Sequence, residues 1–177
     1  RFNGAQSNFD FDAEHHFQTG DFGAQNVDAY FGGGDAGYTF ADAPLKPRLG
    51  ARWLYGSGDR SATDNEMNTF TGNVARPPCC SDPFWIAPAN ARTLAPVLTI
   101  TPHKSLTLEA KYDFIDRLET ADAIYSVPLQ AYPGTAGRLG TDRLSTGPSF
   151  VAAWSPVPEV TVLLSHTENS ADGVLKA

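Results

Sequence analysis

The side chains of residues 105–117 alternate between apolar and polar along the chain. Apolar residues take every second position, at Leu106, Leu108, Ala110, Tyr112 and Phe114, and polar residues take the positions between, at Thr107, Glu109, Lys111 and Asp113. Successive side chains of a β-strand point to opposite faces, so this alternation predicts a strand with one apolar and one charged face. The apolar face changes from leucine to aromatic along the strand, which is typical of a lipid-facing strand that ends at a membrane–water interface.

The same alternation recurs along the chain and predicts eight strands. They cover residues 8–18, 22–31, 37–41, 46–56, 92–101, 105–117, 145–154 and 159–167. Gly32-Gly33-Gly34-Asp35 is predicted to reverse the chain between the second strand and the third. Two irregular stretches, 57–90 and 118–144, are too long to be ordinary connections. The pattern therefore predicts an all-β, antiparallel barrel segment that spans residues 1–177 and carries two long loops.

The lengths of the connections indicate a membrane environment. Short turns at 19–21, 42–45, 102–104 and 155–158 fall at one end of the predicted sheet, and both long loops fall at the other. Outer-membrane barrels have short periplasmic turns and long extracellular loops, whereas a soluble sandwich has no reason to sort its loops in this way. We therefore predict a transmembrane β-barrel in a bacterial outer membrane, with the lipid bilayer and its lipopolysaccharide as partners. The alternative is a soluble lipocalin-like barrel or sandwich that acts as a ligand-binding or structural module, with its apolar residues packed in a central core.

The direction of the strands gives an expectation about completeness. The first of the eight strands would descend from the outside, and the eighth would ascend and end outside. Complete barrels of this class have periplasmic termini and an even number of strands, closed so that no edge lies in lipid. We therefore expect a partial barrel, with at least one further strand before residue 1 and one after residue 177.

Composition narrows the class of protein further. Charged residues make up 19% of the chain, 16 glycines and 13 prolines interrupt it, and no apolar run reaches the length of about 18 residues that a transmembrane helix needs. The net charge of −7 argues against a nucleic-acid partner, because such proteins carry a basic patch. Catalytic motifs such as G-x-S-x-G and H-E-x-x-H are absent from the sequence. We therefore expect a protein that is not an enzyme and that uses no cofactor.

Charged residues on the polar faces of the strands are candidates for the lining of a lumen. They are Asp10, Asp12, Glu14, Arg48, Arg52, Glu109, Lys111, Asp113 and Arg117. Rings of charged side chains select ions in pores, so the arginines could guide an anion. Acidic residues share the same face, however, and a mutually neutralising network that holds the shape of the wall explains the same residues. Both interpretations stay open at this point.

Aromatic residues gather near the strand ends on the apolar faces. Trp53, Tyr55, Tyr112 and Phe114 are expected at the loop end, and Phe17 and Trp154 at the turn end. These positions fit the two interfacial girdles of a membrane barrel, and ordinary core packing is the alternative.

The first long loop holds two further candidate features. Asp59 and Asp64 offer oxygen ligands for a calcium ion, although turns in which aspartate caps backbone amides explain the same residues. No other metal site is expected. The adjacent Cys79 and Cys80 form either a vicinal disulfide, which a compartment outside the cytoplasm would permit, or two free thiols.

Several short motifs resemble those of the alginate-export family of bacterial outer-membrane barrels. The resemblance is carried by Lys46-Pro47-Arg48-Leu49-Gly50, followed by Ser57-Gly58-Asp59, Asp64 and Asn68-Thr69-Phe70. It extends upstream to Asp10-Phe11-Asp12-Ala13-Glu14, Gln18-Thr19-Gly20 and Gly37-Tyr38-Thr39-Phe40, and downstream to Arg117, Asp122 and Tyr125. The matches occur in the same order as in the family and span roughly residues 8 to 125.

This resemblance implies a barrel of about 18 strands, the porin size class, of which the chain would be the C-terminal half without its last strand. It also implies passive passage of a polar or charged solute, which is the polyanion alginate in the founding member. Pro148-Ser149 stand after Gly147 where the family has acidic residues, so the identity of the solute is not carried over to this chain.

Overall fold

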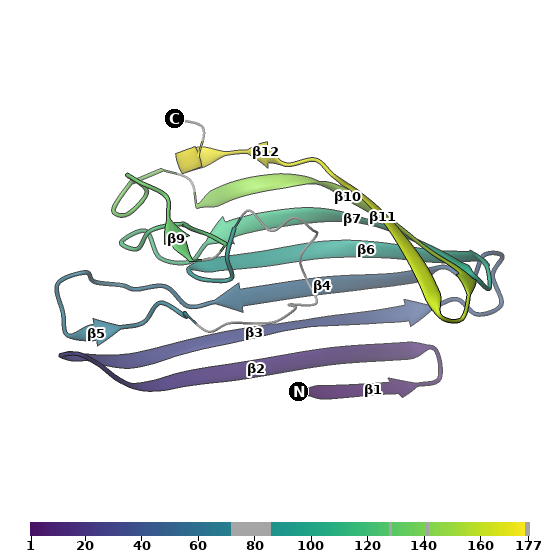
Figure 1. The fold of residues 1–177 in the computed structure, drawn as a ribbon, viewed down its shortest axis with the longest axis horizontal. Helices are drawn as coiled ribbons and strands as arrows, with labels where there is room; N and C mark the ends of the chain where they lie inside the picture. The colour runs from purple at the N-terminus through teal and green to yellow at the C-terminus, as the bar shows by residue number, and fades with distance from the viewer. Residues whose placement is uncertain (72–85, 128, 141, 176–177) are drawn as a thin grey trace.

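The strands form one sheet whose order follows the chain (Figure 1). The computed structural model describes residues 1–71, 86–127, 129–140 and 142–175. The main strands are β1 (Phe2–Gln6), β2 (Phe9–Phe22), β3 (Gln25–Thr39), β4 (Arg48–Gly56), β6 (Ala91–His103), β7 (Leu106–Arg117), β10 (Arg143–Val157) and β11 (Val160–Thr167). Each pairs with the next in antiparallel register.

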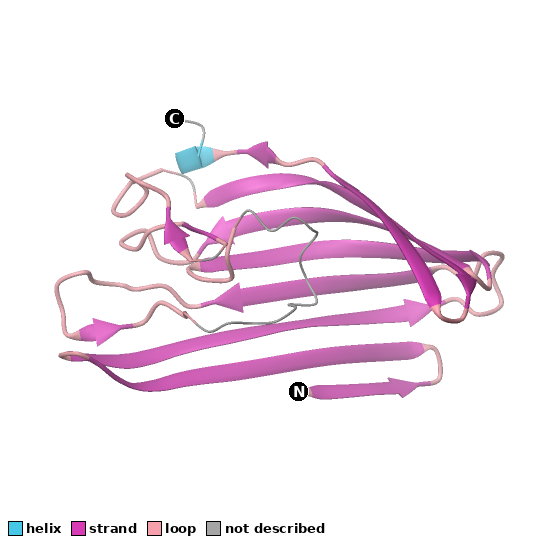
Figure 2. Cartoon of the chain, in the orientation of Figure 1, coloured by secondary structure: helices cyan, strands magenta, loops and turns pink. Residues whose placement is uncertain are grey.

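Short elements lie in the loops and after the last long strand (Figure 2). They are β5 (Glu66–Met67), β8 (Tyr125–Ser126), β9 (Gln130–Ala131), β12 (Ser170–Ala171) and a 3₁₀ turn at Gly173–Leu175. β5 adds to β3 in parallel, β12 adds to β10, and β8 pairs with β9. No helix among the described residues has the length and apolarity to cross a membrane.

The predicted all-β, antiparallel fold is confirmed. The sheet is open, with β1 and β11 at its edges, and the described residues do not close into a barrel. An open meander of long antiparallel strands is consistent with a segment of a barrel wall, because neighbouring strands of such barrels are joined by hairpins in chain order.

The predicted reversal at Gly32–Asp35 is wrong. These residues lie in the middle of β3, and the residues predicted as a separate strand, 37–41, are the end of that same strand and the start of the turn after it. The turn between β2 and β3 lies at Gly23-Ala24 instead of 19–21, and Gly23 adopts a φ of 65° there. β1 is an additional strand that the hydrophobic pattern missed.

The glycines of β3 make room for aromatic rings that come from β4. Tyr55 and Trp53 pair with Gly32 and Gly34 in the register of the two strands. A Cβ atom on Gly34 would lie 2.5 Å from Cζ2 of Trp53, and a Cβ atom on Gly32 would collide with Oη of Tyr55. Close approach of another group is a known reason for glycine inside a strand. Glycine occurs both in turns and where another group comes close to a strand, so the sequence Gly32-Gly33-Gly34 does not distinguish the two.

Both long loops leave the sheet at the same end, which we call the loop end (Figure 1). The tight turn at Gly23-Ala24 lies there too. The opposite end, the turn end, carries the short connections at 7–8, 40–47, 104–105 and 158–159. Residues 37–41 do not form a separate strand, so β2 runs from the turn end to the loop end, opposite to the predicted direction of the first strand. The strand that runs from the loop end to the turn end before it is β1.

The two faces of the sheet differ in chemistry. We call the side of the sheet to which Leu108 points the apolar face, and the side to which Arg52 points the network face. The register of the strands assigns every other side chain to one of these two sides. Large exposed side chains of the apolar face are Phe9, Phe11, Phe17, Tyr30, Tyr38, Leu49, Leu94, Leu98, Tyr112, Phe150, Trp154, Val160, Val162 and Leu164. Because side chains alternate along every strand, this division persists from β2 to β10, whereas on β11 the exposed Leu163 lies on the network side.

The apolar face is tall enough to cross a hydrocarbon core. It extends from Phe9 to Phe17 on β2, from Tyr30 to Tyr38 on β3, and from Leu106 to Phe114 on β7. Each of these segments has about nine residues, close to the length of about 9–11 residues that a tilted transmembrane strand needs.

Aromatic side chains on the apolar face lie near both ends of the sheet. Trp53, Tyr55, Tyr112 and Phe114 lie toward the loop end, and Trp154 lies toward the turn end. The predicted position of Phe17 at the turn end is wrong. Phe17 pairs with Tyr30 near the loop end, because residues 37–41 belong to β3 and β2 therefore runs toward the loop end.

Replacing Gly32 by alanine is expected to destabilise the protein by about 1–3 kcal/mol, the usual cost of overpacking, because the new methyl group collides with the Tyr55 ring. In a Tyr55→Ala background the same replacement should cost less, because Nδ1 of His15, 2.9 Å from the new Cβ atom, is then the remaining close contact. Urea-dependent loss of the folded, heat-modifiable form in detergent micelles gives the four free energies of unfolding. An equal cost in both backgrounds would contradict this role of Gly32.

Candidate pore-lining network and loop clasp

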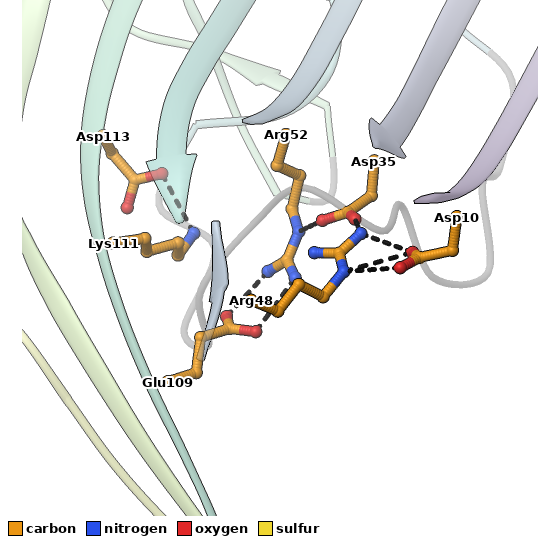
Figure 3. A network of polar contacts seen from close by, with 7 residues as sticks. All are labelled: Asp10, Asp35, Arg48, Arg52, Glu109, Lys111 and Asp113. Carbon is orange, nitrogen blue, oxygen red and sulfur yellow. Dashed lines mark hydrogen bonds and ion pairs between the residues drawn. The ribbon is translucent and has the colours of Figure 1, made fainter. Parts of the chain in front are cut away.

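Ion pairs on the network face join β2, β3, β4 and β7 into one chain of charges (Figure 3). Arg48 contacts two carboxylates: its Nη2 lies 2.5 Å from Oδ1 of Asp10 and also contacts Asp35. Arg52 donates from Nε to Oδ2 of Asp35 at 3.0 Å and from both Nη atoms to Glu109, at 2.8 and 3.0 Å. Four of these side chains are mostly buried, and Asp10 is the most exposed.

Arg48 reaches Asp10 by crossing over β3. Neighbouring strands lie about 4.8 Å apart, so this step spans about 10 Å and requires a long side chain. Gly37 lies beneath the guanidinium, and a Cβ atom there would collide with Cζ of Arg48. A Cβ atom on Gly50 would lie 2.7 Å from Nη1 of the same side chain. The two glycines therefore form the groove that holds Arg48 against the sheet.

Arg52 crosses over β6 to reach Glu109 on β7. Its partner in register on β6 is Ala95, which is fully buried and leaves space for the arginine stem. The two parallel N–H···O bonds to Glu109 use the planar fork of the guanidinium, which is the strongest form of arginine–carboxylate pairing. This pair connects β4 with β7 independently of the backbone hydrogen bonds of the sheet.

Lys111 and Asp113 form a separate, deeply buried pair on the same face of β7. Nζ of Lys111 lies 2.9 Å from Oδ1 of Asp113, and the two side chains are 3% and 4% exposed. The hydroxyl of Ser149 on β10 donates to Oδ2 of Asp113 at 3.0 Å. An acidic residue at position 149, as in the family pattern, would bring a second negative charge against Asp113. A serine there supplies a hydrogen-bond donor instead.

Two further candidates, Asp12 and Glu14, lie on the network face of β2. Asp12 pairs with Arg1, and Oε2 of Glu14 lies 3.7 Å from Nε2 of His16. They continue the charged surface beside the chain of ion pairs, in which they take no part.

Arg117 lies on the network face of β7 by register, where the second long loop covers it. It is 1% exposed at the end of β7, where Nη2 donates to the carbonyl of Arg138 at 2.6 Å. Its Nη1 lies 3.5 Å from the carbonyl of Thr135, and its Nε lies 3.5 Å from Oδ1 of Asp142. Arg117 therefore holds the second long loop in place.

The chain of charges from Asp10 to Glu109 is nearly neutral. It contains the carboxylates of Asp10, Asp35 and Glu109 and the guanidiniums of Arg48 and Arg52, so its formal charge is −1. Each arginine lies between two carboxylates, an arrangement that matches the neutralising interpretation more closely than a ladder of cations. Asp35 pairs with both arginines and is absent from the predicted lining, because the glycine-rich pattern before it predicts a turn.

Both long loops fold back over the network face at the loop end. Phe70 of the first loop stacks on Phe31 of β3, with ring centroids 5.2 Å apart, and packs with Ala29 and Leu54. A second apolar cluster joins the two loops to the strand ends and contains Ile86, Ala91, Ile124 and Leu144. The loops therefore cover part of the face that carries the charges.

Asp122 of the second loop binds donors from both loops. Its Oδ2 accepts hydrogen bonds from the backbone N–H of Asp59 at 2.9 Å and from the hydroxyl of Thr69 at 2.6 Å. Its Oδ1 accepts from the hydroxyl of Tyr125 at 2.7 Å and from the backbone N–H of Ala123 at 2.7 Å. The carboxylate is 8% exposed, and these donors offset the cost of its burial.

Asn90 makes a second connection between the loops. It is fully buried with a φ of 51°, and its Nδ2 donates to the carbonyls of Glu119 and Ala123 at 2.8 and 3.0 Å. Its Oδ1 accepts from the backbone N–H of Glu119 at 2.7 Å. We call Thr69, Asn90, Asp122 and Tyr125 the loop clasp. Thr69, Asp122 and Tyr125 belong to the motifs that resemble the alginate-export family, whereas no sequence pattern singles out Asn90.

The loop clasp changes the acidity of one of its members. Burial and the hydrogen bond to Asp122 raise the pKa of the Tyr125 hydroxyl to about 12. Both effects favour the neutral phenol, whose O–H donates a hydrogen bond to the Asp122 carboxylate.

Asp59 and Asp64 form local turns in the first loop. Their Oδ1 atoms accept hydrogen bonds from the backbone N–H groups of Ser61 and Glu66, each at 3.1 Å. This geometry is the amide-capping alternative to a calcium site. Across the part of the chain that the structure describes, no three His, Cys, Asp or Glu side chains are grouped to hold a metal ion. Cys79 and Cys80 lie outside the described residues.

A sheet with one exposed apolar face and one face of paired charges is the pattern of an outer-membrane channel wall. The family model described as alginate export matches residues 1–166, and the resemblance seen in the motifs is thereby confirmed. The chain belongs to the alginate export family, a family of transport proteins and not of enzymes, and this membership indicates an export or channel role at the outer membrane. No curated protein and no solved structure matches the chain.

Loss of the Tyr125 proton is expected to open the loop clasp at high pH. The folded protein holds this proton more tightly than the unfolded chain, whose tyrosine pKa is about 10. The stabilising contribution is therefore complete below a pH of about 10 and is lost as the pH rises through about 12. Ultraviolet difference absorbance between the protein and its Tyr125→Phe variant isolates this titration. A midpoint near the ordinary tyrosine value would show that Tyr125 is not held in the clasp.

Proposed function

We propose that this protein is a porin-like channel of a bacterial outer membrane, through which a polar or charged solute passes by passive diffusion. The observation that carries the proposal is the separation of the two faces. Leu164 is 73% exposed on the apolar face, whereas the side chains of Lys111 and Asp113 on the network face are buried. A water-soluble domain buries its apolar side chains and exposes its charges, which is the opposite distribution.

The soluble lipocalin-like barrel or sandwich is the weaker interpretation. It requires Leu106, Leu108, Val160, Val162 and Leu164 to pack in a central core. These residues lie on the face opposite to Arg48, Arg52 and Lys111, and the three from β11 are 46–73% exposed. An apolar surface of this extent associates in water but is satisfied by the hydrocarbon of a bilayer. The lipid bilayer with its lipopolysaccharide is therefore the partner that we propose for the apolar face.

The network face supplies the properties that a lumen needs. Its charged side chains are held in fixed positions along the wall by their ion pairs with one another. Both signs are present between Asp10 and Glu109, which suits a hydrated, charged solute. A polyanion such as alginate is the solute class that the family description suggests. The loops that fold over this face at the loop end would narrow the path of the solute.

Single-channel recording of the full-length protein in planar lipid bilayers tests this proposal. We expect a current that is proportional to the applied voltage and that needs no nucleotide hydrolysis or coupled transport. The Arg52→Gln variant removes the arginine partner of Glu109 and one of the two arginine partners of Asp35, so the reversal potential in a salt gradient should shift toward cation selectivity. Glu109→Gln should shift it toward anion selectivity. Lys104→Gln is the control, because Lys104 is exposed in the turn between β6 and β7 at the turn end, away from the loops.

The outcomes separate the parts of the proposal. A protein that stays soluble without detergent would support the ligand-binding or structural module instead. A protein that partitions into detergent with heat-modifiable migration, but conducts no current, would refute the channel. Conductance with unchanged selectivity in both Arg52→Gln and Glu109→Gln would assign the network to the scaffold of the wall.

A further inference from the structure

Two arginines and one aspartate form a row across the apolar face at the loop end. Arg92 on β6 pairs in register with Asp116 on β7, which in turn pairs with Arg143 on β10. Nε of Arg92 donates to Oδ2 of Asp116 at 3.3 Å, and Nε of Arg143 donates to Oδ1 of the same carboxylate. We call these residues the arginine row. Its formal charge is +1, on a chain whose net charge is −7.

The arginine row lies at the boundary of the apolar face nearest to the loop end. The next side chains on the same face, toward the turn end, are Leu94 on β6 and Phe114 on β7, followed by Tyr112. Cζ of Arg143 lies 5.3 Å from the centroid of the Phe114 ring, and the rings of Tyr112 and Phe114 are 5.1 Å apart. The Arg143 guanidinium therefore lies against the Phe114–Tyr112 pair, where the apolar surface ends.

The geometry of the row presents positive charge outward. Asp116 is the least exposed of the three side chains, at 14%, whereas Arg92 is 59% exposed and Arg143 is 34% exposed. One mostly buried carboxylate thus positions two guanidiniums side by side, and its single negative charge faces their two positive charges. If the row served merely to solvate the rim, a single arginine would balance Asp116.

We propose that Arg92 and Arg143, positioned by Asp116, bind a phosphate group on an acylated phosphoglycolipid of the outer leaflet. The inference rests on the proposed function, because this level of the sheet meets lipid headgroups only if the apolar face spans the bilayer. Guanidinium groups match the oxygens of a phosphate in paired hydrogen bonds. Leu94, Phe114 and Tyr112 beneath them offer an apolar surface for the acyl chains of the same molecule. The continuity of charge and apolar surface favours a lipid over free phosphate as the ligand.

Native mass spectrometry of the full-length protein in neutral detergent micelles tests the site, with diphosphoryl lipid A as the probe. We expect Arg92→Gln to weaken the binding of this lipid about tenfold, the loss of one charge-assisted interaction. Arg60→Gln, which removes an equal charge from the exposed loop, should leave binding unchanged. The same lipid without its phosphates should bind the protein and the Arg92→Gln variant equally.

Arg92→Lys provides a variant that keeps the charge of the row. It should retain more binding than Arg92→Gln but less than the unaltered protein, because lysine lacks the planar fork. Equal lipid affinity in the unaltered protein and in Arg92→Gln would overturn the proposal. Binding of inorganic phosphate as tight as that of the lipid would also overturn it, since the ligand would then be the free anion.

Conductance separates this inference from the proposed function. Each variant is first recorded in planar bilayers, where Arg92→Gln should conduct like the unaltered protein because its side chain lies on the face away from the network. A variant that conducts normally and has lost lipid binding supports the site. A protein that conducts but whose lipid binding ignores Arg92 refutes the site alone, and a protein that conducts no current refutes the channel.

Discussion

Every strand of this sheet must satisfy two different surroundings at once, and the alternation of its side chains is the means by which it does so. Because neighbouring side chains point to opposite faces, one register fixes both the apolar and the charged surface. Leu98 and Thr99 on β6 lie on opposite faces for this reason, as do Tyr112 and Lys111 on β7. A slip of one residue would exchange the two faces and move the arginines of β4 onto the apolar side.

The ion pairs of the network face gain less energy than their number suggests. Partly buried charges lose hydration, and this cost offsets much of the attraction between them. Their clearer effect is geometric, since Arg48 and Arg52 each cross a strand and hold their charges at fixed points on the wall. Small residues make both crossings possible, at Gly37 under Arg48 and at Ala95 in register with Arg52. On the other face, Gly32 and Gly34 accept aromatic rings in the same manner.

Alternation predicted the faces well, because it depends only on the geometry of a single strand. Arg48, Arg52, Glu109, Lys111 and Asp113 lie on one face, opposite the leucines and aromatic residues. It failed at Gly32–Asp35, where glycine signals a turn as readily as a close contact, and the role of Asp35 was lost with it. The predicted place of Phe17 fails for the same reason, because the false reversal at Gly32–Asp35 inverts the direction of β2. The loop clasp joins residues far apart in the chain, so no local pattern predicts it.

The orientation of the apolar face can be measured directly with spin labels in the full-length protein, reconstituted into lipid vesicles after Cys79 and Cys80 are replaced by serine. One label is attached at Leu98→Cys on the apolar face, and a second at Thr99→Cys on the network face. If the apolar face meets lipid, oxygen should relax the label at position 98 strongly, and a water-soluble nickel chelate should relax the label at position 99. A label at position 98 that is shielded from both reagents would mean that the leucines pack in a protein core, and it would contradict the central claim.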